Sequence, residues 1–184
     1  MKSLCRALFL SIFVAFFISP ALAKDAPDSG IKGLWIKATG LPKGATLEDV
    51  TDDENDPPRF IYSFGQGADG PAVTIAVTRY PQNALAKRIA KLDKKALAES
   101  VGSAVFFQTA KNLKFADAPA FSQKFKYPCQ MASYTDADVG FDETTLFIQT
   151  DTFMFSVEVI RDAKGKYSEA DAEKWLMNLE MVKQ

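Results

Sequence analysis

The clearest pattern in this chain is an alternation of apolar and polar side chains over residues 143–160. A polar break at Gln149–Thr152 divides the segment into two runs, and each run alternates with a period of two. β-Branched and aromatic residues at that period are typical of strands that pack at least one face on a core. We therefore predict an antiparallel hairpin at the centre of a sheet. Its second run places four apolar residues on one face: Phe153, Phe155, Val157 and Val159.

Shorter alternating runs predict further strands on the N-terminal side of this hairpin. Residues 121–127 place aromatic side chains on one side only, which predicts a one-sided strand with residues 131–135 as its antiparallel successor. Residues 38–58 show neither the period of two that is typical of strands nor helical spacing for long, so we predict an irregular loop there. The other predicted strands are residues 31–37, 59–64 and 72–80, and a short one around Leu113 and Phe115.

Two segments carry apolar residues at helical spacing. The longer runs from Ala84 to about Val101, and Asn83 is placed to cap its first turn. The second runs from Glu169 to about Glu180, where Ser168 and Asp171 have the spacing of a capping box. The prediction is an α+β fold: an antiparallel sheet with one long helix after the third strand and a C-terminal helix packed on the sheet.

The first 23 residues have the pattern of a signal peptide. Lys2 and Arg6 precede an almost wholly apolar run, and residues 21–23 read Ala-Leu-Ala, so we expect cleavage after Ala23. The apolar run is too short to span a membrane comfortably, so we expect no transmembrane segment after cleavage. Residues 24–184 have the size of a single domain, and the expected location is periplasmic or secreted.

The charge of the chain is nearly balanced, with 22 basic and 23 acidic residues. Such a balance gives no electrostatic reason to bind nucleic acid or an anionic membrane. The chain has no histidine, which excludes Ser-His-Asp and Cys-His catalytic sites and any zinc site built on imidazole. We recognise no replacement catalytic constellation and no cofactor motif, so we expect a protein that is not an enzyme and has no cofactor.

One cysteine, Cys129, remains after removal of the signal peptide. It follows Tyr127-Pro128 between two apolar segments, which favours a small buried core residue. The alternative is a reactive thiol, but the chain offers no histidine and no second cysteine to activate or resolve it.

An acidic segment at residues 48–56 is the one surface feature that suggests binding. Its spacing fails the calcium-loop template, which requires glycine and glutamate where this chain has Pro57 and Ser63. A second alternation at Asp136, Asp138 and Asp142 fails the same template, so we expect no metal site. The acidic segment is either a solvated loop or a docking loop for a basic partner. The residues of that candidate docking loop are Asp52, Asp53, Glu54 and Asp56.

The order of predicted elements resembles the Mog1/PsbP fold, including the small exported PsbP-like proteins of bacteria. Three features carry the resemblance: a helix after the first three strands, the Phe121-x-x-x-Phe125-x-Tyr127 strand, and a terminal helix bearing Trp175. The resemblance implies a non-catalytic accessory protein, because known members of the fold mostly assist larger assemblies.

Two functions are therefore predicted. The first is an exported accessory module that binds another exported or envelope protein through its sheet face or the loop at residues 38–58. The alternative is a carrier of a small apolar ligand held between sheet and helix, which would use the many aromatic residues.

Overall fold

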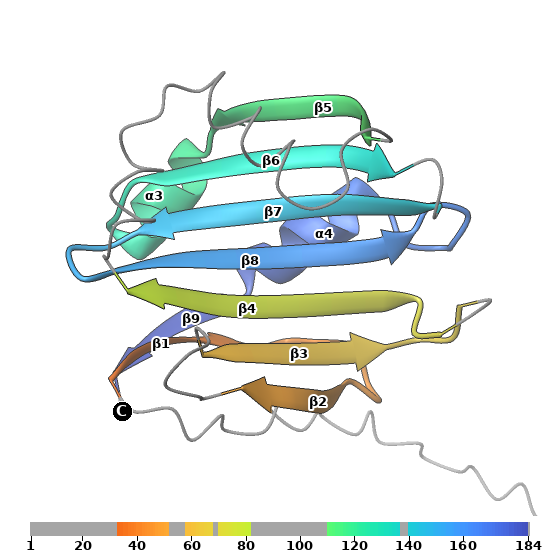
Figure 1. Cartoon of the computed structure of the whole chain (residues 1–184), viewed down its shortest axis with the longest axis horizontal. Coiled ribbons are helices and arrows are strands. Elements are labelled where there is room, and N and C mark those ends of the chain that lie inside the picture. The colour runs from red at the N-terminus through yellow and green to blue at the C-terminus, as the bar shows by residue number, and fades with distance from the viewer. Residues whose placement is uncertain (1–32, 52–57, 68–69, 82–109, 137–139, 184) are drawn as a thin grey trace, which may run out of the picture.

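The computed structural model describes residues 33–51, 58–67, 70–81, 110–136 and 140–183. Their main feature is a seven-stranded antiparallel sheet with the strand order β2-β3-β4-β8-β7-β6-β5 (Figure 1). The α+β class and the antiparallel sheet are confirmed for this part of the chain. The strands are β2 (Thr46–Thr51), β3 (Arg59–Phe64), β4 (Val73–Pro81), β5 (Ala110–Asp117), β6 (Cys129–Asp136), β7 (Phe141–Gln149) and β8 (Phe153–Asp162).

The predicted hairpin over residues 143–160 is confirmed as β7 and β8, and β8 is the middle strand of the sheet. Phe155 pairs with Ile148 across the hairpin, and Val157 pairs with Leu146. The Thr150 side chain closes the turn, because its hydroxyl accepts from the Phe153 amide at 2.9 Å. Buried residues lie on both faces of β8: Phe155, Val157 and Val159 on one, Met154 and Ser156 on the other.

A second layer covers one face of the sheet (Figure 1). It consists of two helices, α3 (Pro119–Phe125) and α4 (Glu169–Met177), and a two-stranded antiparallel ribbon of β1 (Leu34–Ala38) and β9 (Leu179–Lys183). The ribbon joins the first and last described strands of the chain. The predicted capping box at the start of α4 is confirmed, since the Ser168 hydroxyl accepts from the Asp171 amide and the Asp171 carboxylate accepts from the Ser168 amide.

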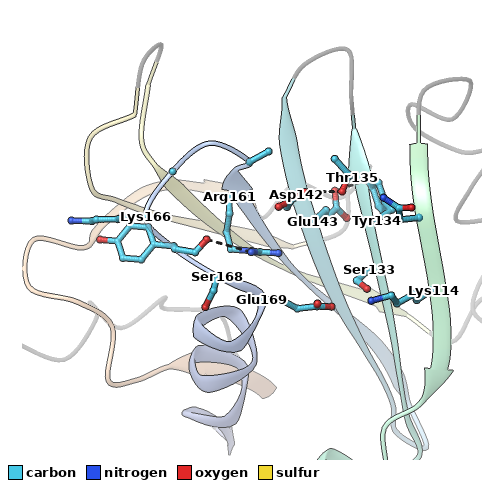
Figure 2. A pocket seen from close by; sticks show the side chains of 14 residues that line it. Lys114, Ser133, Tyr134, Thr135, Asp142, Glu143, Arg161, Lys166, Ser168 and Glu169 are labelled. Carbon is cyan, nitrogen blue, oxygen red and sulfur yellow. Dashed lines mark hydrogen bonds between the residues drawn. The ribbon is translucent and has the colours of Figure 1, made fainter.

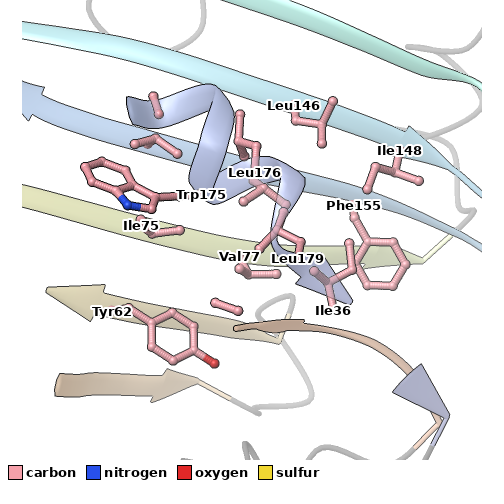
Figure 3. Close-up of a cluster of buried hydrophobic side chains, with 14 of the residues drawn as sticks. Ile36, Tyr62, Ile75, Val77, Leu146, Ile148, Phe155, Trp175, Leu176 and Leu179 are labelled. Atoms are coloured by element: carbon pink, nitrogen blue, oxygen red, sulfur yellow. The ribbon is translucent and has the colours of Figure 1, made fainter. Parts of the chain in front are cut away.

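The hydrophobic core lies between the sheet and this second layer (Figure 3). Leu176 of α4 is fully buried among side chains of the central strands. Trp35 of β1 packs edge-on against Phe60 and Phe155, with ring centroids 4.5 Å and 5.9 Å away. The Arg79 guanidinium lies 5.5 Å from the Trp35 ring and donates to the Leu34 carbonyl, so polar and apolar contacts together fasten the ribbon to the sheet.

The predicted strand at residues 121–127 is wrong, because this segment forms helix α3 and the end of its cap. Phe121 and Phe125 are both buried, and residues four apart share a face in a helix as well as in a strand. Pro119 in the first turn and the left-handed Lys126, with φ of 63°, set the ends of the helix. Strand β6 therefore pairs with β5 and β7, not with residues 121–127.

The predicted irregular loop at residues 38–58 is also wrong in part, because Thr46–Thr51 forms the edge strand β2. A register shift between Leu47 and Asp49 interrupts its pairing with β3. Such a bulge inserts an extra residue and so breaks the period of two that sequence reasoning requires.

The terminal helix ends at Met177, not near Glu180. Leu179 begins β9 and is buried as a strand residue, although it also lies four positions after Trp175, where a helix would bury it. The predicted helix at Ala84 to about Val101 lies outside the described residues. Four described strands, rather than three, precede that segment.

Candidate functional site

The described residues form a polar hollow of about 640 Å³ where one end of the sheet meets the start of α4 (Figure 2). The hollow lies on the face of the sheet that α4 covers. Its lining comes from β5, β6, β7, the end of β8, the following turn and the first residues of α4. Most of the lining side chains are polar or charged: Asn112, Lys114, Ser133, Tyr134, Thr135, Asp142, Glu143, Arg161, Lys166, Tyr167, Ser168 and Glu169.

The hollow exists because small polar residues replace apolar ones along this face of the sheet. Met131 pairs with Leu146 near the middle of β6 and β7, and these apolar side chains pack on the core. Two residues further on, Ser133 pairs with Thr144. Residues at intervals of two share a face, so the apolar filling under α4 stops at this point. The turn at residues 162–166 then forms one wall. A hydrogen bond of 2.9 Å from the Gly165 amide to the Asp162 carbonyl closes this turn.

Arg161 is the most unusual side chain in this hollow. It is only 4% exposed, yet no carboxylate of the described residues lies within ion-pair distance of it. Its terminal nitrogens donate to the Tyr167 carbonyl at 3.5 Å and to the Thr144 hydroxyl at 3.4 Å, and its Nε has no partner. A buried charge normally has a counter-charge and short hydrogen bonds, because leaving water is costly. The Arg161 guanidinium therefore lacks short hydrogen bonds and an ion-pair partner among the described residues.

Asp142 lies directly opposite Arg161 in the antiparallel pairing of β7 and β8. It makes no ion pair with Arg161, and its Oδ1 accepts a hydrogen bond of 2.8 Å from the Thr135 hydroxyl on the other side. The half-buried carboxylate is thus held in place by β6. Two opposite charges face the hollow from neighbouring positions without contacting each other.

Three exposed charged residues stand at the rim of the hollow. Figure 2 shows Lys114 and Glu169 pointing into the same space from opposite sides, one from β5 and one from α4. Lys166 lies against the Tyr167 ring, with its Nζ 5.0 Å from the ring centroid. The entrance therefore carries both signs of charge, while the interior holds the buried cation.

A second polar network includes two lining residues of the hollow, Tyr134 of β6 and Glu143 of β7. The Glu143 carboxylate accepts from the Tyr134 hydroxyl at 2.5 Å and from the Thr145 hydroxyl at 2.7 Å. Burial raises the pKa of Glu143, with a smaller contribution from Glu158, and the two hydrogen bonds act in the opposite direction. Burial and the neighbouring Glu143 carboxylate also raise the pKa of Tyr134. The network ties two strands together and holds an acid that is harder to ionise than a free one.

Replacing Glu143 with glutamine should change how stability depends on pH. Because the folded protein raises the pKa of this acid, the native state binds its proton more tightly than the unfolded state does. Stability from this group is present at low pH and is lost as pH rises through the folded pKa. Urea unfolding between about pH 4 and about pH 7 should show the wild type losing stability relative to Glu143→Gln as pH rises.

The exposed Glu180 supplies the control for that experiment. Glu180→Gln also removes one carboxylate from the chain, so it controls for the loss of a negative charge. If the difference between the wild type and Glu143→Gln were constant with pH, Glu143 would not be titrating abnormally in the folded protein.

Cys129 is 4% exposed and belongs to the core. Burial raises the pKa of its thiol to about 11 from an ordinary value of 9.0, and the Ser122 hydroxyl slightly offsets this. Because the thiolate is the reactive form, a maleimide should label native Cys129 at neutral pH about 100-fold more slowly than the unfolded protein. Equal rates in the two states would show an accessible thiol and would contradict the core assignment.

The structure leaves the other sequence-based candidates apart from this hollow. The candidate docking loop, Asp52, Asp53, Glu54 and Asp56, lies outside the described residues, as does Asp138. Asp136 is buried near the turn, and Asp142 lines the hollow. Among the residues that can be described, no cluster of three or more His, Cys, Asp or Glu side chains is arranged to hold a metal ion.

Sequence reasoning missed Arg161, although a signal for it was present. The inward-facing series of β8 runs through Phe155, Val157 and Val159, and the next member of that series is residue 161. Extending the alternation by one step places an arginine on the core face of the sheet. A charged residue in that position is the pattern that indicates a functional cation.

None of the helices in the described ranges combines the length and the hydrophobicity needed to cross a membrane. A scan against protein-family models and a search of curated proteins each found no match to this chain.

Proposed function

We propose that this chain is an exported, non-catalytic accessory module that binds its ligand or partner in the hollow around Arg161. The observation that carries the proposal is the buried Arg161 guanidinium, which lines a polar hollow and has no carboxylate of the described residues within ion-pair distance, although Asp171 attracts it from further away. A bound anionic group would supply an ion-pair partner and short hydrogen bonds. Binding rather than catalysis is favoured because the chain lacks histidine, the usual general acid-base residue.

The export and the domain organisation remain part of this proposal. Residues 1–23 would be removed after Ala23, and residues 24–184 would act as one domain in the periplasm or outside the cell. We still expect a long helix at residues 84–101, because its apolar residues recur at helical spacing. The likeness to Mog1/PsbP proteins agrees with an accessory role, and the acidic loop at residues 52–56 stays a predicted docking surface for a basic partner.

The alternative of an apolar-ligand carrier gains no support from the described residues. The space between the sheet and α4 is filled by side chains such as Ile75, Leu146 and Leu176, all at most 1% exposed. The hollow that does exist is polar. We therefore prefer recognition of a charged group.

Native mass spectrometry of the protein isolated from its own compartment tests this proposal. The wild type should carry a bound small molecule or partner that is lost on denaturation, and the Arg161→Gln variant should be isolated without it. Glu180→Gln, which changes an exposed charge near the start of β9, should retain it. Identical bound species on the wild type and on Arg161→Gln, or none on either, would contradict a binding role for this hollow.

A further inference from the structure

Resting on the proposed binding role of this hollow, we propose that it recognises an α-carboxylate together with the nitrogen next to it. That chemistry occurs in a free amino acid and in the C-terminal residue of a peptide. Arg161 would bind the carboxylate, and Asp142 would accept a hydrogen bond from the nitrogen.

The Arg161 guanidinium is suited to bind the carboxylate of the ligand. A guanidinium presents five N–H donors in a planar fork that matches the two oxygens of a carboxylate. The described structure uses two of its nitrogens, both at the long end of the hydrogen-bond range, 3.4 and 3.5 Å. Since the side chain is 4% exposed, a charge-assisted bond here would be little weakened by water. Lys114 faces the same hollow and adds a second positive charge.

The lining of the hollow favours a ligand group with a single negative charge over a phosphate group, which carries two. Asp142 stands opposite Arg161, and Glu169 points into the hollow from α4. Both carboxylates would repel a phosphate dianion more strongly than a carboxylate monoanion. The mixed lining therefore favours a ligand that carries both signs of charge, or one negative charge and a hydrogen-bond donor.

The third part is the nitrogen. Thr135 uses one lone-pair site of the Asp142 carboxylate, which has about four. Directly opposed residues of an antiparallel pair hold their Cβ atoms about 5 Å apart. Arg161 and Asp142 are such a pair, and no ion pair joins them. Their side chains therefore start close together on one face of the sheet, and a ligand with a carboxylate and a nitrogen on one carbon atom offers a group to each, whether the nitrogen is an ammonium group or a peptide N–H.

The volume of the hollow, about 640 Å³, lies within the usual range of ligand sites and accommodates a side chain or a second residue. Both sources of the α-carboxylate therefore remain open to experiment. Isothermal titration calorimetry of the native protein can separate them. The probes are the common L-amino acids and tripeptides with a free C-terminus, the same amino acids and tripeptides amidated at that carboxyl group, the corresponding carboxylic acids that lack the α-nitrogen, and inorganic phosphate.

Binding of amino acids alone would identify a free amino acid as the ligand, and binding of free-carboxylate tripeptides would identify a peptide C-terminus. In either case amidation of the carboxylate should abolish binding. Arg161→Gln should weaken the binding probe about 10- to 100-fold, the usual effect of losing a charge-assisted hydrogen bond. Asp142→Asn should weaken it about tenfold, but should leave the analogue without the nitrogen unchanged.

Three results would overturn the inference. They are equal binding of free and amidated peptides, phosphate binding more tightly than every carboxylate probe, and no binding of any probe. If phosphate binds and Arg161→Gln abolishes it, the ligand class is wrong but the binding role of the hollow stands. Circular dichroism of both variants should match the wild type, which separates loss of binding from loss of folding.

Discussion

Replacing Trp35 with alanine should lower the free energy of unfolding by about 3–5 kcal/mol. The side chain is 1% exposed and packs edge-on against Phe60 and Phe155, so its removal leaves a cavity where the β1–β9 ribbon meets the sheet. It also removes the ring beneath the Arg79 guanidinium. Because a domain is stable by only about 5–15 kcal/mol, this one change is expected to remove a large part of the total.

Urea unfolding followed by circular dichroism measures this effect, and Met177→Ala is the matched control. Met177 ends α4 and is 37% exposed, so its truncation should change stability by less than about 0.5 kcal/mol. A loss of about 1 kcal/mol or less for Trp35→Ala would mean that the ribbon is not packed on the sheet as described.

Replacing Arg161 with methionine should raise the stability of the ligand-free protein by about 1–4 kcal/mol. The reason is that methionine replaces the aliphatic stem of the arginine without burying a charge that has no ion-pair partner. Only two long hydrogen bonds, to Tyr167 and Thr144, are lost in return. Urea unfolding of the two purified proteins, after dialysis to remove small molecules, measures the difference.

Arg161→Lys is the control for that comparison, because it keeps the charge and should not be stabilised. A strong destabilisation of Arg161→Met would assign a structural role to the arginine. The expected gain in stability would instead mean that the buried cation is retained for a purpose other than folding, as is common at functional sites.

The strands of the sheet could be predicted from the sequence wherever one face of the strand is apolar. The β7–β8 hairpin and its turn were predicted with nearly correct bounds, because Phe155, Val157 and Val159 leave little ambiguity. The failures have two physical causes. Phe121 and Phe125, and likewise Trp175 and Leu179, are spaced so that helix and strand both place them on one face. In β2 the bulge removed the alternation altogether.

The candidate site was less predictable than the fold. Sequence patterns drew attention to the acidic segment at residues 48–56, because charged clusters are visible without a structure. Arg161 and Asp142 are far apart in the chain, and only the β7–β8 register places them opposite each other. Whether a buried arginine has a counter-charge depends on tertiary contacts that no local pattern encodes.

The most direct test of the binding hollow is the NMR signal of the Arg161 Nε–H group. The Nε atom is buried and has no hydrogen-bond partner, so its proton should report any anionic group that reaches the guanidinium. The signal can be assigned by its absence in Arg161→Lys. During titration with the tightest-binding free-carboxylate probe, it should shift progressively until saturation, and the matching amidated probe should leave it in place. An Nε–H signal that stays unchanged with both probes at saturating concentration would contradict recognition of a carboxylate at Arg161.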